Sequence, residues 1–278
     1  MAVQTLRIGH SPDPDDAFMF YGLASGKVKI PGFAIEHVME DIQSLNVRAL
    51  RADLEVTAIS AHAYPYVADK YWIMATGASM GEGYGPVLVA KNYASIAELR
   101  HETVATPGKL TTANLLFKIY TDGIEQKDMP FDLIIDAVLG GHVAAGLLIH
   151  EGQLTYADMG LKKILDFGEL WRDETGGLPL PLGLDVVRSN RGEAFAHKVS
   201  RALRDSIRYG YDHQEESIPY ALQFGRGIDA DVGSRFVKMY VNERTIDMGE
   251  EGKRALELLF SKAHERGLIP QRPEVVLY

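Results

Sequence analysis

Apolar and polar residues form short blocks along the first two thirds of the chain, and the pattern switches repeatedly between the period of a strand and that of a helix. Strands are expected at 5–10, 33–39, 55–60, 72–75, 87–90, 103–106, 143–150, 164–167 and 184–187. Helices are expected between them, at 16–24, 42–51, 63–68, 111–120 and 133–139. Strands and helices that alternate in this way predict a parallel or mixed α/β sheet.

The last third of the chain, from Glu193 to Gly267, has helical spacing almost throughout. Four helices are expected there, at 194–211, 215–224, 230–240 and 250–266. No long linker separates the two α/β portions that precede this segment. We therefore expect two lobes joined by crossing strands, for which the apolar segments 87–90 and 182–187 are the candidates.

This layout is that of an α/β, bilobal, type II periplasmic-binding-protein-like fold, in which two lobes close on a ligand cleft about a hinge. The first lobe would comprise residues 1–89 and 185–278, with the helical C-terminal segment packed back on it. The second lobe would comprise residues 90–184. Since open α/β sheets bind ligands at the C-terminal ends of their strands, residues that follow strands are the first candidates for a site.

The composition narrows the kind of partner. The chain has 278 residues, 46% of them apolar and 24% charged, as in ordinary globular proteins. Its net charge of −9 argues against nucleic acid or an anionic membrane, so a small-molecule substrate is the expected partner. The absence of cysteine excludes disulfides, thiolate zinc ligands and cysteine nucleophiles.

The location can also be predicted from the sequence. No run of apolar residues approaches the roughly 18 that a membrane helix needs, and no secretory signal precedes the first expected strand. We therefore expect a cytoplasmic protein. The sequence leaves open whether it is a monomer or a homodimer.

His150 ends the apolar run Gly-Leu-Leu-Ile-His that begins at Gly146. A buried parallel strand of this kind delivers a titratable side chain to the ligand-binding edge of a sheet. The ordinary pKa of histidine suits proton transfer near neutral pH, so His150 is the candidate general base. The alternative is a histidine whose hydrogen bonds are satisfied at the end of a strand.

Ser11 follows the first expected strand and begins the sequence Ser-Pro-Asp-Pro-Asp-Asp. Its hydroxyl and the first amides of the next helix are placed to bind a polar or anionic ligand group. The alternative for this segment is structural, with Asp15 or Asp16 capping the helix. The clustered aspartates also suggest a metal site, but no further ligands accompany them.

Two threonines, Thr111 and Thr112, begin the helix that follows Pro107-Gly108. Gly108 permits an unusual backbone conformation, so that hydroxyls and helix amides can converge on one ligand oxygen. A simple threonine N-cap is the alternative. Gly108, Thr111 and Thr112 are therefore candidate substrate-binding residues.

Two further candidates follow the third strand and the glycine-rich run that comes after it. Ser60 ends its strand as Ser11 does, and Tyr84, within the run Gly77–Gly85, is placed to stack on a ligand ring. The alternatives are a helix cap for Ser60 and a surface turn for the run.

Other familiar motifs are missing from the sequence. No Gly-x-Gly-x-x-Gly fingerprint follows a strand, and neither His-Glu-x-x-His nor Gly-x-Ser-x-Gly occurs. We therefore expect no nicotinamide or flavin cofactor and no metal.

Six groups of residues, spread over nearly the whole chain, carry a resemblance to a known family. They are Ser11–Asp16 with Phe18 and Phe20, Gly85-Pro86, Pro107-Gly108 with Thr111-Thr112, Ile149-His150-Glu151 with Thr155-Tyr156, Leu178–Gly183, and Val241-Asn242 with Gly249–Gly252. Together they resemble the 1,4-dihydroxy-6-naphthoate synthases, enzymes of the futalosine route to menaquinone. Many members of that family carry Cys and Asn in place of Asp13 and Asp15, whereas others carry acidic residues, which leaves the role of this loop open.

The resemblance implies a bilobal binding-protein fold, a cytoplasmic location and no cofactor. The implied reaction is the lyase-type conversion of cyclic dehypoxanthine futalosine to 1,4-dihydroxy-6-naphthoate and a sugar-derived fragment. The family's proposed base corresponds to His150, and the hydroxyl pair at a helix start corresponds to Thr111 and Thr112. Two alternatives stay open: chorismate dehydratase of the same pathway, and a non-catalytic small-molecule-binding protein on the same scaffold.

Overall fold

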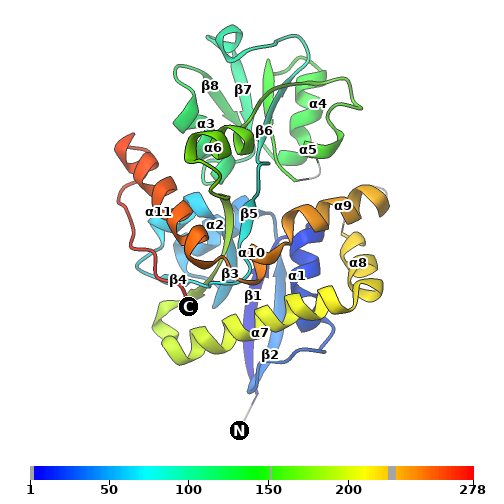
Figure 1. Cartoon of the computed structure of the whole chain (residues 1–278), viewed down its shortest axis with the longest axis vertical. Helices are drawn as coiled ribbons and strands as arrows, with labels where there is room; N and C mark the ends of the chain where they lie inside the picture. Colours follow the sequence, from blue (N-terminus) through cyan, green and yellow to red (C-terminus); the bar gives the residue numbers. More distant parts are fainter. Residues whose placement is uncertain (1–2, 151, 225–229) are drawn as a thin grey trace.

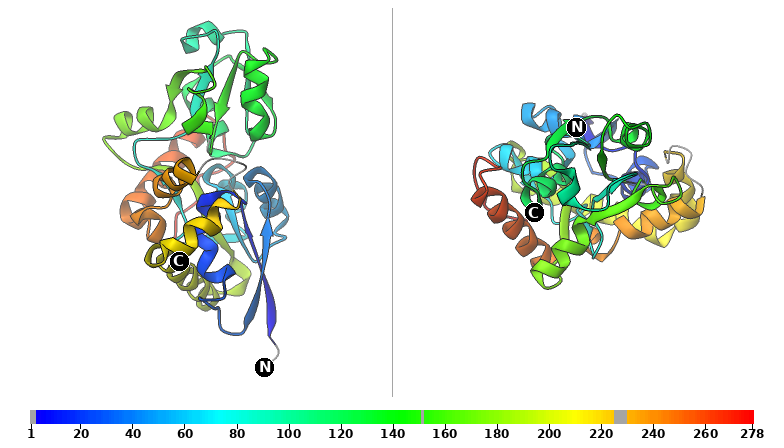
Figure 2. Two further views of the ribbon diagram at one scale, coloured as in Figure 1. Left: turned by 90° about the vertical axis from the view of Figure 1, so that its right-hand side faces the viewer. Right: turned by 90° about the horizontal axis from the view of Figure 1, so that it is seen from above.

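Two β-sheets form the framework of the computed structural model, which describes residues 3–150, 152–224 and 230–278. Each sheet carries its own helices, so the molecule has two lobes, one above the other in Figure 1 and in the left view of Figure 2. Glu151, part of one motif singled out above, lies outside the described residues. The bilobal α/β fold expected from the sequence is confirmed.

The sheet of the first lobe has the strand order β2-β1-β3-β11-β4, with β5 paired to β11. Its strands are β1 (Gln4–His10), β2 (Phe33–Met39), β3 (Val56–Ser60), β4 (Tyr71–Ile73), β5 (Ser79–Gly81) and β11 (Leu180–Arg188). β1 is parallel to β2 and β3, whereas β11 runs antiparallel to β3, β4 and β5. The C-terminal ends of β1 and β3 therefore lie at the same edge of the sheet, and Ser11 and Ser60 are both found at that edge.

The helices of the first lobe come mostly from the C-terminal third of the chain. They are α1 (Pro14–Ala24), α2 (Ile42–Arg51), α7 (Glu193–Asp212), α8 (Gln214–Leu222), α9 (Ala230–Tyr240), α10 (Glu243–Ile246) and α11 (Gly249–Glu265), with the 3₁₀ turns η1 (Ala61–Tyr66) and η4 (Ser189–Arg191). Along α7 the buried residues Val199, Leu203 and Ile207 recur every fourth position, the spacing of one apolar helix face. α1 packs against α7, α8 and α9, so the first helix is enclosed by the last part of the chain.

The second lobe is built on a five-stranded sheet of order β10-β6-β9-β7-β8. Its strands are β6 (Val87–Ala90), β7 (Thr103–Thr106), β8 (Glu125–Asp128), β9 (Ala145–Leu148) and β10 (Lys162–Asp166). Its helices are α3 (Thr112–Tyr120), α4 (Ile134–Leu139), α5 (Gly152–Thr155) and α6 (Phe167–Thr175), with η2 (Ile96–Leu99) and η3 (Phe131–Leu133). Because β7 and β9 are parallel neighbours, the segment leading to α3 and the segment carrying His150 leave the sheet at the same edge.

Two segments connect the lobes. Residues 82–86 lead from β5 to β6, and residues 176–179 lead from α6 to β11. The two segments expected to cross between the lobes correspond to β6 and β11. Each of these strands belongs to a single sheet, so the chain crosses just outside them. The expected lobe boundaries, after residues 89 and 184, fall inside these two strands.

The backbone beside the first connection lies against the start of α6. The amide of Phe167 donates to the carbonyl of Pro86 at 3.0 Å. A Cβ atom at Gly168 would lie 1.9 Å from the carbonyl carbon of Tyr84, so only glycine fits at this contact. The close approach fixes where the second lobe joins the first.

An apolar core runs through both lobes without a break. It includes buried residues of β3 and β11 in the first lobe, of β6 and α3 in the second, and of α11, which lies against both β11 and α3. In the described part of the chain, no helix has the length and apolar character to cross a membrane.

The structure departs from the sequence pattern at short or polar elements. The pattern does not predict the nine-residue helix α6 or the short elements β5, α5 and α10, which span three or four residues each. It also misses β8, which reads Glu-Gln-Lys-Asp. The strand expected to end at His150 ends at Leu148 instead, because His150 has a φ of +56° and leaves the extended region. That part of the prediction is wrong.

Candidate active site

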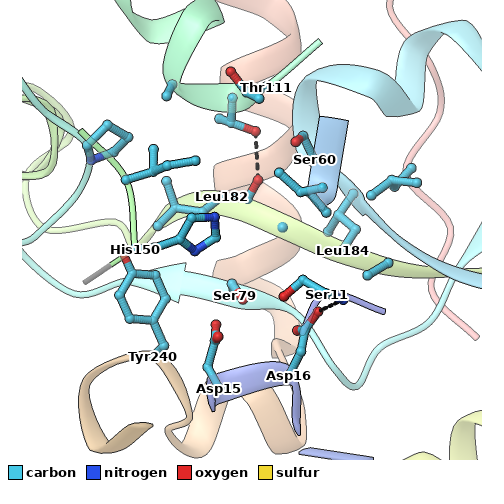
Figure 3. A pocket seen from close by; sticks show the side chains of 18 of the residues that line it. Ser11, Asp15, Asp16, Ser60, Ser79, Thr111, His150, Leu182, Leu184 and Tyr240 are labelled. Atoms are coloured by element: carbon cyan, nitrogen blue, oxygen red, sulfur yellow. Dashed lines mark hydrogen bonds between the residues drawn. The ribbon is translucent and has the colours of Figure 1, made fainter. Parts of the chain in front are cut away.

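A pocket of about 700 Å³, counted with its open mouth, lies between the lobes. Its lining from the first lobe is Ser11, Asp15, Asp16, Ile42, Ala58, Ile59, Ser60, Gly77, Ser79, Leu182, Gly183, Leu184 and Tyr240. Its lining from the second lobe and the connection is Pro86, Thr111, Thr112, Ala113, Ile149, His150 and Gln153. Figure 3 shows polar side chains entering this space from opposite sides.

His150 occupies the second-lobe side of the pocket and is the candidate base expected from the sequence. Its ring packs on that of Phe131, with the centroids 4.8 Å apart, and its side chain is 15% exposed. The buried Nε2 atom has no hydrogen-bond partner among the described residues. A non-glycine residue in the left-handed region is uncommon and is often functional, and the free Nε2 argues against a merely satisfied histidine.

Asp13 reaches His150 from the other lobe. Its Oδ2 atom lies 3.3 Å from Nδ1 of His150, and the carboxylate is 1% exposed. The hydroxyl of Ser11 donates to the same oxygen at 2.8 Å, and the amide of Asp13 donates back to that hydroxyl at 3.1 Å. Ser11 thus lines the pocket and also braces the carboxylate beside the histidine.

Neither Asp15 nor Asp16 is the N-cap of α1, so that part of the structural alternative is wrong, although both acidic residues do lie at the helix start. Asp13 is the N-cap residue, and its side chain makes no capping bond. Asp15 and Asp16 lie in the first turn, and Figure 3 shows both carboxyl groups directed into the pocket. The amide of Ser11 donates to Oδ2 of Asp16 at 2.6 Å, whereas Oδ1 of Asp15 has no partner among the described residues.

Burial changes the acidity of these two carboxyl groups. It raises the pKa of Asp15 well above its usual value, and the charges of Asp16 and Asp13 add to the effect. Burial also raises the pKa of Asp16, to about 6, against the hydrogen bond from Ser11. The floor of the pocket therefore holds carboxyl groups that retain protons closer to neutral pH than ordinary ones. Among the described residues, no cluster of three or more histidine, aspartate or glutamate side chains is arranged to hold a metal ion.

The threonine pair lies where the sequence indicates, at the start of α3 and in the pocket. Thr111 is the N-cap: its hydroxyl accepts from the amide of Asn114 at 3.2 Å and donates to the carbonyl of Gly108 at 2.8 Å. The hydroxyl of Thr112 donates to the carbonyl of Leu182 at 2.6 Å and so ties α3 to the first lobe. Both threonine hydroxyls donate their hydrogens to backbone carbonyls. The donors that the start of α3 can offer a ligand are therefore the amides of its first turn.

Ser60 also lines the pocket, beside the end of β3. Its amide donates to Oδ1 of Asn46 at 2.8 Å, and its hydroxyl accepts from Nδ2 of the same residue at 3.0 Å. The hydroxyl makes no bond that caps η1, so the capping alternative does not describe it. Asn46 of α2 thus holds Ser60 in place at the pocket wall.

Gly108 and Tyr84 are not among the described residues that line the pocket, so the structure does not bring these two candidates to the site. Gly108 shapes the turn before α3: its φ is +132°, and a Cβ there would lie 2.6 Å from Oε1 of Gln43. The Tyr84 hydroxyl donates to the carbonyls of Met80, at 3.2 Å, and Met239, at 2.5 Å. Its ring packs edge-on against Tyr240, with centroids 5.3 Å apart, so it supports the pocket wall from behind.

Tyr240 and Gln153 are pocket residues that the sequence does not indicate. The hydroxyl of Tyr240, on α9, lies 2.5 Å from the amide of Gln153, on α5. With the amide oriented so that its oxygen accepts this bond, its nitrogen donates to the carbonyl of Gly85 at 2.6 Å and its oxygen also accepts from the amide of His150 at 3.2 Å. This network holds the backbone of His150 in its unusual conformation. Only the tertiary packing of α9 against the second lobe reveals it.

Comparison with known proteins places the chain in a family. A family model described as menaquinone biosynthesis matches residues 6–265. The chain belongs to this menaquinone-biosynthesis family. Two curated relatives are named 1,4-dihydroxy-6-naphthoate synthase: one from Thermus thermophilus, 38% identical over 98% of each chain, and one from Streptomyces coelicolor, 38% identical over 97% of this chain and 96% of the relative. The resemblance seen in the sequence is thereby confirmed, and it is an enzyme family.

Solved structures that resemble this chain have the same two-lobed architecture. A protein from Archaeoglobus fulgidus is 48% identical, covers 95% of this chain and 98% of its own, and superposes with a TM-score of 0.91. The alkanesulfonate-binding protein of Xanthomonas axonopodis pv. citri superposes with a TM-score of 0.73 over 99% of this chain and 97% of its own at 14% identity, which shows the fold alone. The binding-protein-like fold is thus shared far beyond the family.

Proposed function

We propose that this protein is a 1,4-dihydroxy-6-naphthoate synthase. In this proposal it is a cytoplasmic carbon–carbon lyase that converts cyclic dehypoxanthine futalosine to 1,4-dihydroxy-6-naphthoate without a cofactor. The names of the two curated relatives support the product, 1,4-dihydroxy-6-naphthoate. The observation that carries the chemistry is an imidazole nitrogen without a partner in a pocket that also receives the start of α3.

His150 is the general base in this proposal. A neutral imidazole removes a proton next to a carbonyl when the two lie within hydrogen-bond reach, and such catalysis contributes ~10²–10⁴-fold. Nε2 has no partner among the described residues, so its lone pair is available to a substrate. The ring is held on one side by Phe131 and on the other by Asp13, which keeps it in one orientation.

The start of α3 stabilises the charge that proton removal creates. The first amides of a helix have no partner within it and carry the positive end of the helix dipole. Thr112 and Ala113, the first two residues of α3, line the pocket. An enolate oxygen seated there receives hydrogen bonds from donors that are already oriented, which is the arrangement that favours an anionic transition state.

The remaining walls suit a planar aromatic product. Ile42, Ile59, Leu182 and Leu184 form an apolar lining from the first lobe, and Pro86 and Ile149 complete it. Apolar walls on both sides of a flat ring exclude water from an intermediate that would otherwise be quenched. Because the walls belong to both lobes, the pocket is complete when the lobes are together.

The test is the turnover of cyclic dehypoxanthine futalosine, followed by the absorbance of the naphthoate product. His150→Asn removes the imidazole but keeps a residue that tolerates a positive φ. We expect kcat to fall by at least ~10²-fold with little change in substrate binding. His264→Asn, on the exposed face of α11, is the matched control and should behave as the wild type.

Three results would contradict the proposal. Full activity of His150→Asn would remove His150 from the mechanism. Turnover of chorismate in place of the futalosine derivative would assign the protein to chorismate dehydratase. Tight binding of either compound without turnover by the wild type would make it a binding protein.

A further inference from the structure

We propose that Asp13 is a positioning residue for His150: it holds the imidazole with its proton on Nδ1, so that the Nε2 lone pair faces the pocket. The kinetic consequence of this inference rests on the proposed function, but the state of the ring does not. It also gives the aspartate of this opening loop a role that the sequence leaves open.

The first step of the argument is the geometry of the contact. Oδ2 of Asp13 and Nδ1 of His150 are 3.3 Å apart, an ion-pair contact slightly longer than an ordinary hydrogen bond. Hydrogen bonds between catalytic groups are often this long before a substrate is bound and then tighten. A carboxylate only accepts, so the ring proton between the two atoms must sit on Nδ1. The other nitrogen, Nε2, is then the unprotonated one, and it has no partner among the described residues.

The second step is the rigidity of the carboxylate. Asp13 stands between Pro12 and Pro14, whose rings fix the backbone on both sides of it. The hydroxyl of Ser11 donates to the same Oδ2 atom at 2.8 Å and sets its direction. An almost fully buried carboxylate held in this way orients a histidine more strictly than a mobile one does.

The third step is to compare the other titratable groups around the ring. Asp16, on α1, acts on His150 by its charge, but its Oδ2 is bonded to the amide of Ser11. Tyr240, on α9, is engaged with Gln153 on α5, and the described ring that packs on His150, that of Phe131, is apolar. Asp13 is therefore the group placed to select the tautomer.

The contact also depends on the arrangement of the lobes. Asp13 follows β1 in the first lobe, and His150 follows β9 in the second. The carboxylate orients the ring only while the two lobes are close together. The arrangement of the lobes that encloses the pocket is therefore also the arrangement that orients the base.

The decisive experiment observes the ring itself. In protein labelled with ¹⁵N at histidine, long-range proton–nitrogen NMR correlations distinguish the two neutral tautomers at a pH above about 8. The His150 signals are identified by their loss in His150→Asn. We expect the wild type to carry the proton on Nδ1. In Asp13→Asn an uncharged amide oxygen accepts the Nδ1 proton more weakly than a carboxylate does, so the share of the tautomer protonated on Nε2 should rise.

Asp128→Asn is the matched control, because its carboxylate also accepts from a hydroxyl, that of Thr106 at 2.7 Å, but lies outside the pocket lining. It should leave the His150 signals unchanged. A wild-type ring protonated on Nε2, or a tautomer ratio that Asp13→Asn leaves unchanged, would overturn the inference. The wild-type spectrum decides the matter even if the Asp13 variant fails to fold.

Kinetics supply the second readout. We expect Asp13→Asn to lower kcat ~10- to 100-fold while KM stays near the wild-type value, since the residue acts through His150 and not through the substrate. Asp13→Glu, which keeps a carboxylate, should recover part of the loss. If the wild type does not turn over cyclic dehypoxanthine futalosine, the proposed function fails while the tautomer result still stands. If Asp13→Asn raises KM and leaves kcat unchanged, Asp13 is a substrate contact and the inference fails.

Discussion

At the scale of single residues, burial decides the charge of a histidine that lies just before the site. His10 packs flat on Phe20, with ring centroids 4.5 Å apart, and bonds through Nδ1 to the carbonyl of Ser11 at 2.8 Å and through Nε2 to His37 at 2.9 Å. Burial is the largest cause that lowers the pKa of His10 from 6.5 to about 4. The folded protein therefore keeps this ring neutral at a pH where the unfolded chain protonates it.

This difference makes folding stability depend on pH. Because the folded pKa lies below the unfolded one, the unfolded state binds more protons between about pH 6.5 and about pH 4, and stability falls as the pH drops through that window. Between pH 7 and pH 5 the His10 contribution to this loss is about 2 kcal/mol. In urea unfolding, the unfolding free energy of His10→Asn should fall between pH 7 and pH 5 by about 2 kcal/mol less than that of the wild type.

A comparison of variants is needed because Asp16 acts in the opposite direction. Its folded pKa is raised to about 6, so its protonation favours the folded state as the pH falls. The difference between wild type and His10→Asn isolates the histidine. His264→Asn, on an exposed face, should reproduce the wild-type curve. If the unfolding free energies of wild type and His10→Asn changed in parallel with pH, His10 would be protonated equally in the folded and the unfolded state.

The residues of the site were only partly predictable. Ser11, Ser60, Thr111, Thr112 and His150 follow strands or begin a helix, and a local pattern is enough to find them. Tyr240 and Gln153 meet across the two lobes from distant parts of the sequence, so no local pattern indicates them. The role of Asp13 beside His150 depends on a positive φ at the histidine, which the apolar run before it does not reveal.

At the scale of elements, the start of α3 is set by a glycine that lies outside the pocket. Gly108 has a φ of +132°, and a Cβ there would meet Oε1 of Gln43 at 2.6 Å; the same Oε1 accepts from the amide of Leu110 at 3.0 Å. The turn thus connects α3 of the second lobe to α2 of the first. Its geometry positions the first-turn amides that the proposed function uses.

Gly108→Ala should therefore both destabilise the protein and weaken substrate binding. The strained backbone costs about 1–3 kcal/mol of unfolding free energy, and displacement of Gln43 adds to it. Gly26→Ala is the matched control, since Gly26 also has a positive φ, of +72°, but nothing within 4 Å of a Cβ. Urea unfolding and KM are the measurements. Equal destabilisation in both variants with an unchanged KM would show that the contact with Gln43 does not position α3.

The elements themselves were predictable where the pattern is long. The expected strand at 33–39 and helix at 42–51 coincide with β2 and α2, because each has an apolar face and a defined end, with Asp41 accepting from the amide of Ser44 at the start of the helix. β8 has no apolar residue and exists only because its backbone pairs with β7. Such an edge strand follows from the sheet and not from its own sequence.

At the scale of the whole molecule, the two lobes are less independent than a pair of domains on a hinge. Phe117 on α3, Leu256 on α11 and Leu184 on β11 all belong to one buried apolar cluster. α11 packs on β11 and on α3, and α3 and α6 of the second lobe also contact β11 directly. The second lobe therefore buries part of its core against a helix of the first, and neither lobe keeps its full core without the other.

This shared core predicts that the two lobes unfold together. Differential scanning calorimetry should show one transition, with a calorimetric enthalpy equal to the van't Hoff enthalpy. Phe117→Ala removes a fully buried ring from the shared cluster and should cost about 3–5 kcal/mol, lowering the single Tm without splitting it. Two resolved transitions in the wild type, or a variant in which only the second lobe melts early, would mean that each lobe has a self-sufficient core. In that case closure over a substrate would be a free hinge motion, and the contact between Asp13 and His150 would form only when ligand brings the lobes together.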